Sequence, residues 1–422
     1  MTVNERKAAW IASLSHCFTH GYMTLLPAVM VVLAGEQSLG FFALGTVVNL
    51  GYFLFGAGSI PAGILADRIG AKKILTLGLF GMALSALLVG VSPTSWAFAA
   101  SYALLGLAAS IYHPAGLSLI ARHIEKKGKA LSLHGILGNI GLSLAPLFAG
   151  LMVTLFDTWR AAYLSFGLMG LLFALAVQRI SIENEENLSF RTLLSPELLR
   201  LRSPVMSAID TIPADRDAVK VLPVPLLLLY AGSIAFGFIY RGSLTFFPSL
   251  FQQDIYFISS SEQPVVLAGL VTSMVLSVGV FGQWLGGYVS DRLRRPEMAH
   301  IMIYLVVIPA LYYVSRLSDT PLIAASILFS LVFYGWQPLQ NSLIARCTPR
   351  SAYGKGFGWN FFFIMGMGSI ATAVGGYVAD DQGVDKVYLL LAAVSLAALI
   401  ISAAVIRLAP YSLRFSFRIE RE

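Results

Sequence analysis

Long apolar segments alternate with short polar ones along the whole chain. A helix needs about 20 apolar residues to cross a membrane, and twelve segments meet that length. The strict two-residue alternation that is typical of membrane barrel strands is absent. We therefore expect an all-α polytopic membrane protein with twelve transmembrane helices, at about residues 8–33, 41–66, 74–92, 95–121, 130–155, 159–179, 223–250, 264–290, 298–317, 321–345, 354–379 and 385–408.

One polar interruption, residues 180–222, is much longer than the others and separates the sixth apolar segment from the seventh. It is rich in glutamate, arginine and proline. We expect a six-helix bundle at 1–179, a cytoplasmic linker at 180–222 with a short surface helix around Leu193–Arg202, and a second six-helix bundle at 223–422 that ends in a short cytoplasmic tail.

The chain also repeats itself. Residues 118–122 and 342–346 both read SLIAR, an offset of 224 residues. The same offset relates Gly63 to Gly287, Asp67 to Asp291, Arg68 to Arg292 and Pro114 to Pro338. Two similar apolar halves in tandem indicate a secondary transporter built from parallel repeats.

Composition agrees with a membrane protein. Of the 422 residues, 57% are hydrophobic and only 12% are charged, about half the charged fraction of a soluble domain. The net charge is +7, and most of the 29 lysines and arginines fall on the side of the membrane where the two termini lie. The exceptions are Arg160, Arg241, Arg316 and Lys386. This bias predicts a bacterial inner-membrane protein with both termini in the cytoplasm, and no basic patch remains to bind nucleic acid.

Several classes of function lack their motifs. There is no phosphate-binding loop for ATP, no nucleophile elbow and no histidine–carboxylate pair at metal-binding spacing. Cys17 and Cys347 lie within or at the end of apolar segments, so we expect no structural disulfide. The first apolar segment is interpreted as a retained helix, because no small-residue cleavage site follows it. We expect no enzyme and no cofactor.

The loops after the second and eighth segments carry charged motifs. Residues 63–73 read GILADRIGAKK and residues 287–295 read GYVSDRLRR, which resemble the G-x-x-x-D-R-x-G-x-K/R-K/R motif of the major facilitator superfamily. The resemblance implies gating roles for Asp67, Arg68, Asp291 and Arg292. Physically, such a carboxylate can meet the positive N-terminal end of a helix from the other half. The alternative is that these charges only determine topology.

The resemblance narrows to the fosmidomycin-resistance branch of that superfamily. The matching stretches are Ser15–His20 and Leu25–Pro27 in the first segment, Tyr112–Pro114 in the fourth, and Gly135–Gly141 with Ala145–Pro146 in the fifth. The branch usually has acidic residues where this chain has His20 and often where it has Ala115. These departures remove two candidate proton carriers, so the proton coupling of the branch does not transfer directly.

Three kinds of polar residue inside the spans are candidates for function. His16 and His20 share one helix face and titrate near physiological pH, which indicates proton coupling or substrate binding. The alternatives are hydrogen bonds to a neighbouring helix, or a metal site with Cys17, although Cys17 points around the helix and no carboxylate joins them. Arg241 lies deep in the seventh segment with no deep Asp or Glu to pair with, so it either binds an anion or snorkels to the outer surface.

The third kind is a set of polar residues in equivalent places of the two halves. His113 and Gln337 each precede a proline, which predicts a bend in the fourth and tenth helices, flanking a cavity or serving packing alone. His134 aligns with Asn360 and both are expected near an inner vestibule. Further cavity candidates, whose tryptophans and amides suit an amphipathic organic ligand, are Asn49, Asn139, Gln283, Trp284, Trp336, Gln340, Asn341 and Trp359.

These patterns predict a secondary active transporter that moves a small organic compound by alternating access. The first hypothesis is proton-coupled export of a drug or metabolite, with histidines in place of the usual carboxylate. One alternative is an organic-anion importer or facilitator that uses Arg241, and another is a metal-ion transporter that uses His16, His20 and Cys17. The expected partners are the substrate, protons and the lipid bilayer, and we expect a monomer.

Overall fold

A computed structural model describes residues 1–37, 39–125, 127–183, 185, 223–293, 295–348 and 353–408. Within these residues twelve helices are long and apolar enough to cross a membrane, and each overlaps one predicted segment, which confirms the all-α membrane architecture. The predicted surface helix around 193–202 and most of the predicted linker lie outside the described residues.

The first half of the chain forms six spans, two of which are interrupted. They are α1 (Val3–Gln37), α2 (Phe41–Ala57) with α3 (Ser59–Ile69), α4 (Ala71–Val91), α5 (Ser95–Ala109) with α6 (Tyr112–His123), α7 (Lys127–Phe156) and α8 (Arg160–Arg179).

The second half forms the other six. They are α12 (Pro223–Asp254), α14 (Pro264–Arg292), α15 (Pro296–Val314), α16 (Asp319–Phe333) with α17 (Trp336–Cys347), α18 (Tyr353–Phe361) continuing through the π-helical η2 (Phe362–Met367) into α19 (Ile370–Gln382), and α20 (Val384–Leu408). A short helix, α13 (Tyr256–Ser259), follows α12.

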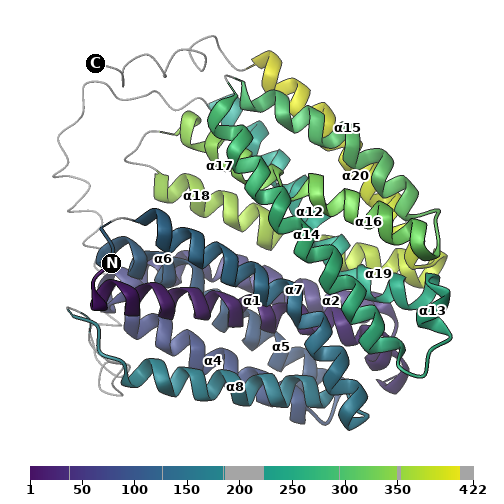
Figure 1. Ribbon diagram of the computed structural model, residues 1–422, viewed down its shortest axis with the longest axis horizontal. Helices are drawn as coiled ribbons and strands as arrows, with labels where there is room; N and C mark the ends of the chain where they lie inside the picture. Colours follow the sequence, from purple (N-terminus) through teal and green to yellow (C-terminus); the bar gives the residue numbers. More distant parts are fainter. Residues whose placement is uncertain are drawn as a thin grey trace.

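The two halves form separate bundles that lie against each other, with the first half in the lower part of Figure 1 and the second half in the upper part. In the first, α1 packs on α7 and α4 on α8, and in the second, α12 and α15 pack on α20. The halves meet chiefly where α7 contacts α14 and where α2 contacts α19. We call the end with the N-terminus and the end of α20 the termini end, and the opposite end, where α13 lies, the far end (Figure 1).

The fourth and tenth spans break at equivalent points of the repeat. The first break separates Ala109 from Tyr112, and the second separates Phe333 from Trp336. Pro114 and Pro338 follow each break. Because proline has no N–H, the carbonyl four residues before it loses its helical partner. The two breaks lie where the prolines predict bends.

Glycine allows the halves to approach closely. A side chain at Gly376 of α19 would overlap the Phe41 backbone of α2, and one at Gly269 of α14 would overlap the Pro146 backbone of α7. Small residues let helices pack backbone to backbone in lipid. Gly376 in the eleventh span and Gly150 in the fifth, which lies against the Val266 backbone of α14, are thus at the interface between the halves.

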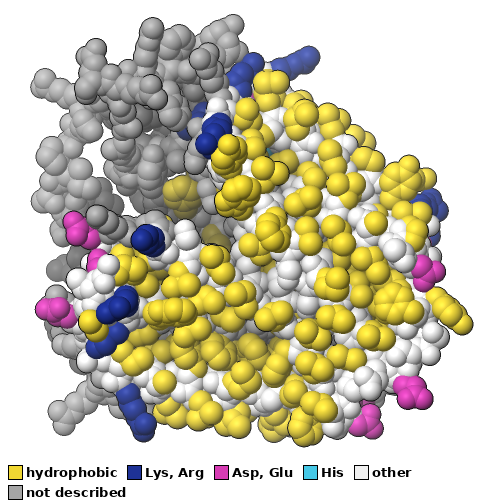
Figure 2. Space-filling model, viewed as in Figure 1, with side chains coloured by type: hydrophobic (Ala, Val, Ile, Leu, Met, Phe, Trp, Pro, Cys, Tyr) yellow, Lys and Arg dark blue, Asp and Glu magenta, His cyan; other side chains and the backbone are white. Residues whose placement is uncertain are grey.

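The outer surface is suited to lipid. Figure 2 shows hydrophobic side chains across the middle of one face, with charged side chains gathered near its two ends. Large apolar residues such as Phe281 and Ile400 are exposed. Trp284 is also exposed, at 69%, and its ring lies 6.0 Å from that of Tyr288. The cavity role of Trp284 stays a prediction.

Candidate functional site

Four of the predicted histidines meet in the first half. His16 lies at the centre: its Nε2 is 2.8 Å from His20 Nε2, and its Nδ1 is 2.8 Å from the His134 carbonyl oxygen. The ring centres of His134 and His113 are 4.0 and 5.1 Å from that of His16. Helices α1, α6 and α7 thus bring together side chains that are far apart in the sequence. We call these four residues the histidine cluster.

The hydrogen bonds of His16 assign its tautomer. A carbonyl oxygen only accepts, so Nδ1 of His16 carries the proton and donates to His134. In neutral His16 the Nε2 atom is then an acceptor, and His20 Nε2 donates to it. A further proton on His16 Nε2 leaves two donors facing each other, whereas one on His20 goes to its Nδ1 and keeps the bond. Proton uptake by His16 would therefore break the His16–His20 bond.

Neighbouring residues position the cluster. The Tyr112 hydroxyl donates to the Ala12 carbonyl at 2.7 Å and lies 3.3 Å from His134 Nδ1. Gly138 leaves room for the His16 ring, which would overlap a side chain at that position. His113 Nε2 is buried and has no hydrogen-bond partner in the described part of the chain.

The predicted metal set does not form as written. Among the described residues, His16, His20 and His113 hold nitrogen atoms within 4.8 Å of one another, and Cys17 is not part of this group. Cys17 instead packs its backbone against Gly141. The third imidazole comes from α6, which no spacing along the chain indicates.

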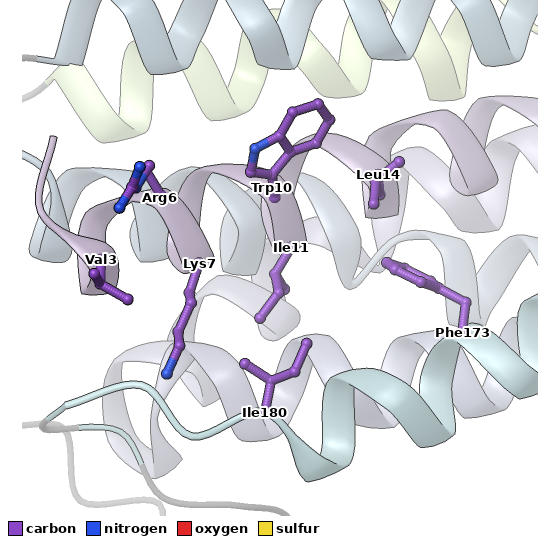
Figure 3. A pocket seen from close by; sticks show the side chains of 8 residues that line it. All are labelled: Val3, Arg6, Lys7, Trp10, Ile11, Leu14, Phe173 and Ile180. Atoms are coloured by element: carbon purple, nitrogen blue, oxygen red, sulfur yellow. The ribbon is translucent and has the colours of Figure 1, made fainter.

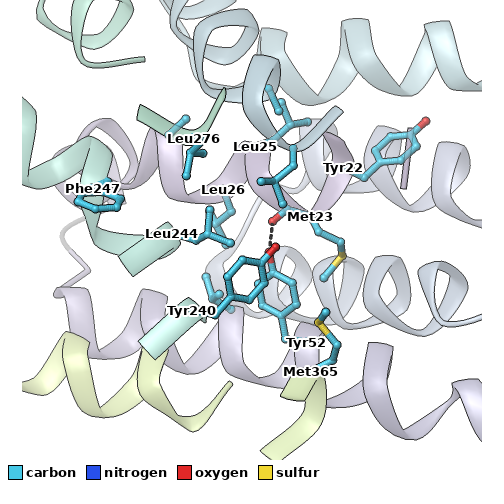
Figure 4. Close-up of a cluster of buried hydrophobic side chains, with 14 of the residues drawn as sticks. Tyr22, Met23, Leu25, Leu26, Tyr52, Tyr240, Leu244, Phe247, Leu276 and Met365 are labelled. Atoms are coloured by element: carbon cyan, nitrogen blue, oxygen red, sulfur yellow. Dashed lines mark hydrogen bonds between the residues drawn. The ribbon is translucent and has the colours of Figure 1, made fainter. Parts of the chain in front are cut away.

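Arg241 of α12 lies between the halves and is only 1% exposed. Its guanidinium carbon is 3.8 Å from the ring centre of Tyr52 and 4.7 Å from that of Tyr240. Its Nη2 contacts Met365 Sδ, and its Nε is buried without a hydrogen-bond partner in the described chain. Figure 4 shows Tyr52, Tyr240 and Met365 close together. Arg241 is enclosed by aromatic faces, so the snorkelling alternative was wrong.

A proline explains why Tyr52 is held in place. Pro27 lies within α1 and cannot donate to the Met23 carbonyl, which is left without its helical partner. The Tyr52 hydroxyl donates to that oxygen at 2.9 Å, drawn as a dashed line in Figure 4. Tyr102 adds a longer contact of 3.4 Å. The free carbonyl of Met23 in α1 thereby holds the Tyr52 ring in the position where it contacts Arg241.

Amide side chains connect the two halves beside these groups. Asn139 of α7 donates to Gln283 Oε1 at 2.8 Å, and Gln283 of α14 donates to Gln337 Oε1 at 3.1 Å. A separate network lies in the second half. Its bonds run from Ser233 to Asn360 (2.6 Å), from Gln340 to Ser233 (2.8 Å) and from Asn360 to Asn341 (3.3 Å).

The predicted tryptophans have different environments. Trp336 is buried, with its ring centre 4.2 Å from Phe236 and 5.0 Å from His300. Trp359 is 48% exposed and stacks on Phe363. His300 is itself buried and was not among the candidates, because a lone histidine near a helix start gives no sequence signal.

The gating residues are only partly described. Nothing is described for the side chains of Asp67, Arg68 and Asp291, whereas Arg292 is exposed and lies over the Tyr288 ring at 3.5 Å. A carboxylate does meet a helix N-terminus of the other half, but at the far end. Asp380 of α19 accepts hydrogen bonds from the N–H groups of Phe41 and Phe42 at 2.7 and 2.8 Å. No sequence motif marks Asp380 for this role.

Comparisons with known proteins agree with this architecture. The fosmidomycin resistance protein of Escherichia coli (strain K12) is 24% identical over 89% of this chain and 87% of its own length. The 4-hydroxybenzoate transporter of Pseudomonas aeruginosa is 22% identical over 80% and 77%. The crystal structure of a bacterial homologue of the human lysosomal transporter Spinster matches with a TM-score of 0.79 at 14% identity, covering 99% of both chains. The family model of the Major Facilitator Superfamily matches residues 11–373, so this chain belongs to that superfamily and is a membrane transporter rather than an enzyme.

Proposed function

We propose that this transporter exports a small organic anion in exchange for protons, with the anion bound beside Arg241 and the proton carried by the histidine cluster. The observation that carries the proposal is the burial of Arg241 without an ion-pair partner among the described residues. A buried charge is costly unless it is compensated. Two tyrosine faces compensate only in part, and an anionic group on the substrate would complete the site.

The histidine cluster supplies the proton-coupling part of the proposal. Arg241 lies within electrostatic range of His20 and His113. A proton on the cluster repels the guanidinium, and the proposed exchange requires that proton and substrate occupy the transporter in alternate steps. Substrate and proton thus act on one another across the interface between the halves. Because protonation of His16 also breaks its bond to His20, the charge change at His16 is linked to the arrangement of side chains on α1.

A metal-ion transporter is less well supported by the same geometry. Three imidazoles can bind a transition metal, and His16, His20 and His113 are close enough to do so. However, that group contains no carboxylate, and Arg241 lies near two of its members. A fixed positive charge beside a divalent cation opposes binding.

Topology and direction are further parts of the proposal. The basic residues on the termini side support an inner-membrane protein with cytoplasmic termini. The far end would then face outward, and the contacts of α2 with α19 and of α7 with α14 would seal it in this structure. The relative named for fosmidomycin resistance supports export, and the relative named for 4-hydroxybenzoate supports a carboxylate-bearing substrate.

Transport assays in inverted and right-side-out vesicles test the proposal, with and without an imposed proton gradient. The panel contains 4-hydroxybenzoate, fosmidomycin, a neutral sugar and a cationic dye. We expect gradient-driven accumulation in inverted vesicles, inhibited by carboxylates and unaffected by the neutral sugar. Accumulation only in right-side-out vesicles would reverse the direction. Accumulation of the cationic dye without competition by any anion would overturn the assignment of Arg241.

A further inference from the structure

A groove lies on the outer surface of the first bundle, away from the interface between the halves. It runs between α1 and α8 near the termini end and has a volume of about 400 Å³. Figure 3 shows its lining residues, which are Val3, Arg6, Lys7, Trp10, Ile11, Leu14, Phe173 and Ile180. None of these residues belongs to the histidine cluster or to the surroundings of Arg241. The proposed transport chemistry leaves this groove without a role.

The groove changes from charged to apolar along its length. Arg6 and Lys7 lie toward the termini end, while Leu14 and Phe173 lie farther into the membrane-spanning region (Figure 3). From Val3 to Leu14 a helix rises about 16 Å, which is close to the thickness of one leaflet of the hydrocarbon core, about 15 Å. Trp10 lies between the two parts, where aromatic residues commonly mark the membrane interface.

The positive charge at the entrance is not neutralised by the protein. Neither Arg6 nor Lys7 forms an ion pair with a carboxylate in the described part of the chain, and both are exposed. Lys7 Nζ donates to the Ser181 carbonyl at 3.2 Å. Lys72 Nζ donates to the neighbouring Ile180 carbonyl, but Lys72 is buried and lies beside the Glu185 carboxylate, so its charge is not counted at the entrance. Glu5 directly precedes Arg6 in α1, but its carboxylate accepts hydrogen bonds from the backbone N–H groups of Thr2 and Glu125.

We propose that this groove binds one anionic phospholipid. An acyl chain lies along Trp10, Leu14 and Phe173, and the phosphate faces Arg6 and Lys7. A basic pocket between helices at the membrane interface matches both the charge and the amphipathic form of such a lipid. The orientation also agrees, since the headgroup end of the groove coincides with the end of α1 that leaves the membrane. A lipid bound there contacts both α1 and α8, next to Ile180, which directly follows α8.

Native mass spectrometry of the full-length purified protein measures this binding. The protein is titrated with phosphatidylglycerol or phosphatidylcholine, and the dissociation constant of the first retained lipid is compared among variants. We expect the wild type to prefer phosphatidylglycerol, and each cation removed in R6Q and R6Q/K7Q to lower that preference about fivefold. The matched control K129Q/R407Q removes two exposed cations from the same end without touching the groove, so its preference should stay near that of the wild type.

A second measurement locates the lipid. Brominated phosphatidylglycerol should quench the fluorescence of the wild type more than that of Trp10→Phe, because Trp10 lines the groove. Equal affinity for the two lipids in the wild type would overturn the proposal. So would an equal loss in R6Q/K7Q and K129Q/R407Q, which would reveal diffuse surface attraction, or quenching that does not depend on Trp10.

Discussion

The two halves place different chemistry at equivalent positions of one repeat. His113 in the first half corresponds to Gln337 in the second, and His16 corresponds to Tyr240. The first bundle thus gathers imidazoles, each of which has a nitrogen that can bind a proton. The second carries Arg241, a permanent cation, and a network of neutral amides. The backbone repeats, down to the broken fourth and tenth spans, but the side chains do not. In this chain a symmetric architecture separates a half that carries the histidine cluster from a half that carries Arg241.

The junctions between the halves differ in the same way. The far-end junction of α2 and α19 uses the Asp380 carboxylate. The related junction of α7 and α14 uses a neutral bond, in which the Leu147 N–H donates to Ser273 Oγ at 3.2 Å. Charge-assisted hydrogen bonds are about twice as strong as neutral ones. The α2–α19 junction should therefore contribute more to holding the far end closed.

The largest effect is expected from removing the fixed charge of the second half. Arg241→Gln should lower transport of an anionic substrate at least about 30-fold, because losing one member of a buried charge pair costs about 2–5 kcal/mol. Arg241→Lys keeps the charge but loses the planar group held against Tyr52 and Tyr240, so its rate should be intermediate. Initial rates in vesicles measure both. Equal rates for wild type and Arg241→Gln would show that the charge is structural.

The next largest effect is expected from removing a histidine of the histidine cluster in the first half. His113→Gln places in the first bundle the residue that the repeat has in the second. Glutamine does not titrate, so transport by this variant, or by His20→Gln, should no longer respond to an imposed proton gradient. His300→Gln is the matched control, since His300 is buried outside the cluster, beside Trp336. A full gradient response in both cluster variants would remove the histidines from coupling.

A smaller effect is expected at the far-end junction. Asp380→Asn weakens the two bonds to the Phe41 and Phe42 N–H groups and should shift the equilibrium toward opening of the far end about tenfold, given about 1.5 kcal/mol for such a bond. Distances between spin labels on the α1–α2 and α19–α20 loops report the shift. Asp381→Asn is the control, because the neighbouring carboxylate bonds only to Gln382 among the described residues. The same distance distribution in both variants would show that the Asp380 hydrogen bonds do not hold the far end closed.

The smallest effect concerns the ring shared by the halves. Tyr52→Phe keeps the aromatic face under Arg241 but loses the bond to the Met23 carbonyl, which should lower the free energy of unfolding by about 1 kcal/mol. Unfolding in a detergent mixture measures the change. Tyr377→Phe, at a residue that is 60% exposed, should leave stability unaltered. A loss of transport in Tyr52→Phe without a loss of stability would instead assign the hydroxyl to substrate binding.

The sequence by itself determined the number and order of the spans, the repeat and the places where the fourth and tenth spans are interrupted. In lipid a segment must satisfy its backbone polar groups within its own helix, so apolar length alone identifies each span. A proline removes its own N–H wherever the chain places it, which is why Pro114 and Pro338 marked the breaks in advance. The pair His16 and His20 was also predictable, because residues four apart share a helix face.

Only the tertiary structure decided which polar groups meet. His113 and His134 joined His16 and His20, while Cys17 did not. Tyr52 and Met365, which enclose Arg241, come from different halves of the chain. Asp380 accepts a hydrogen bond from the N-terminus of α2 in the other bundle. Each of these contacts depends on how helices far apart in sequence lie against one another. Local periodicity places a residue on a face of its helix, but the packing of whole bundles selects what that face contacts.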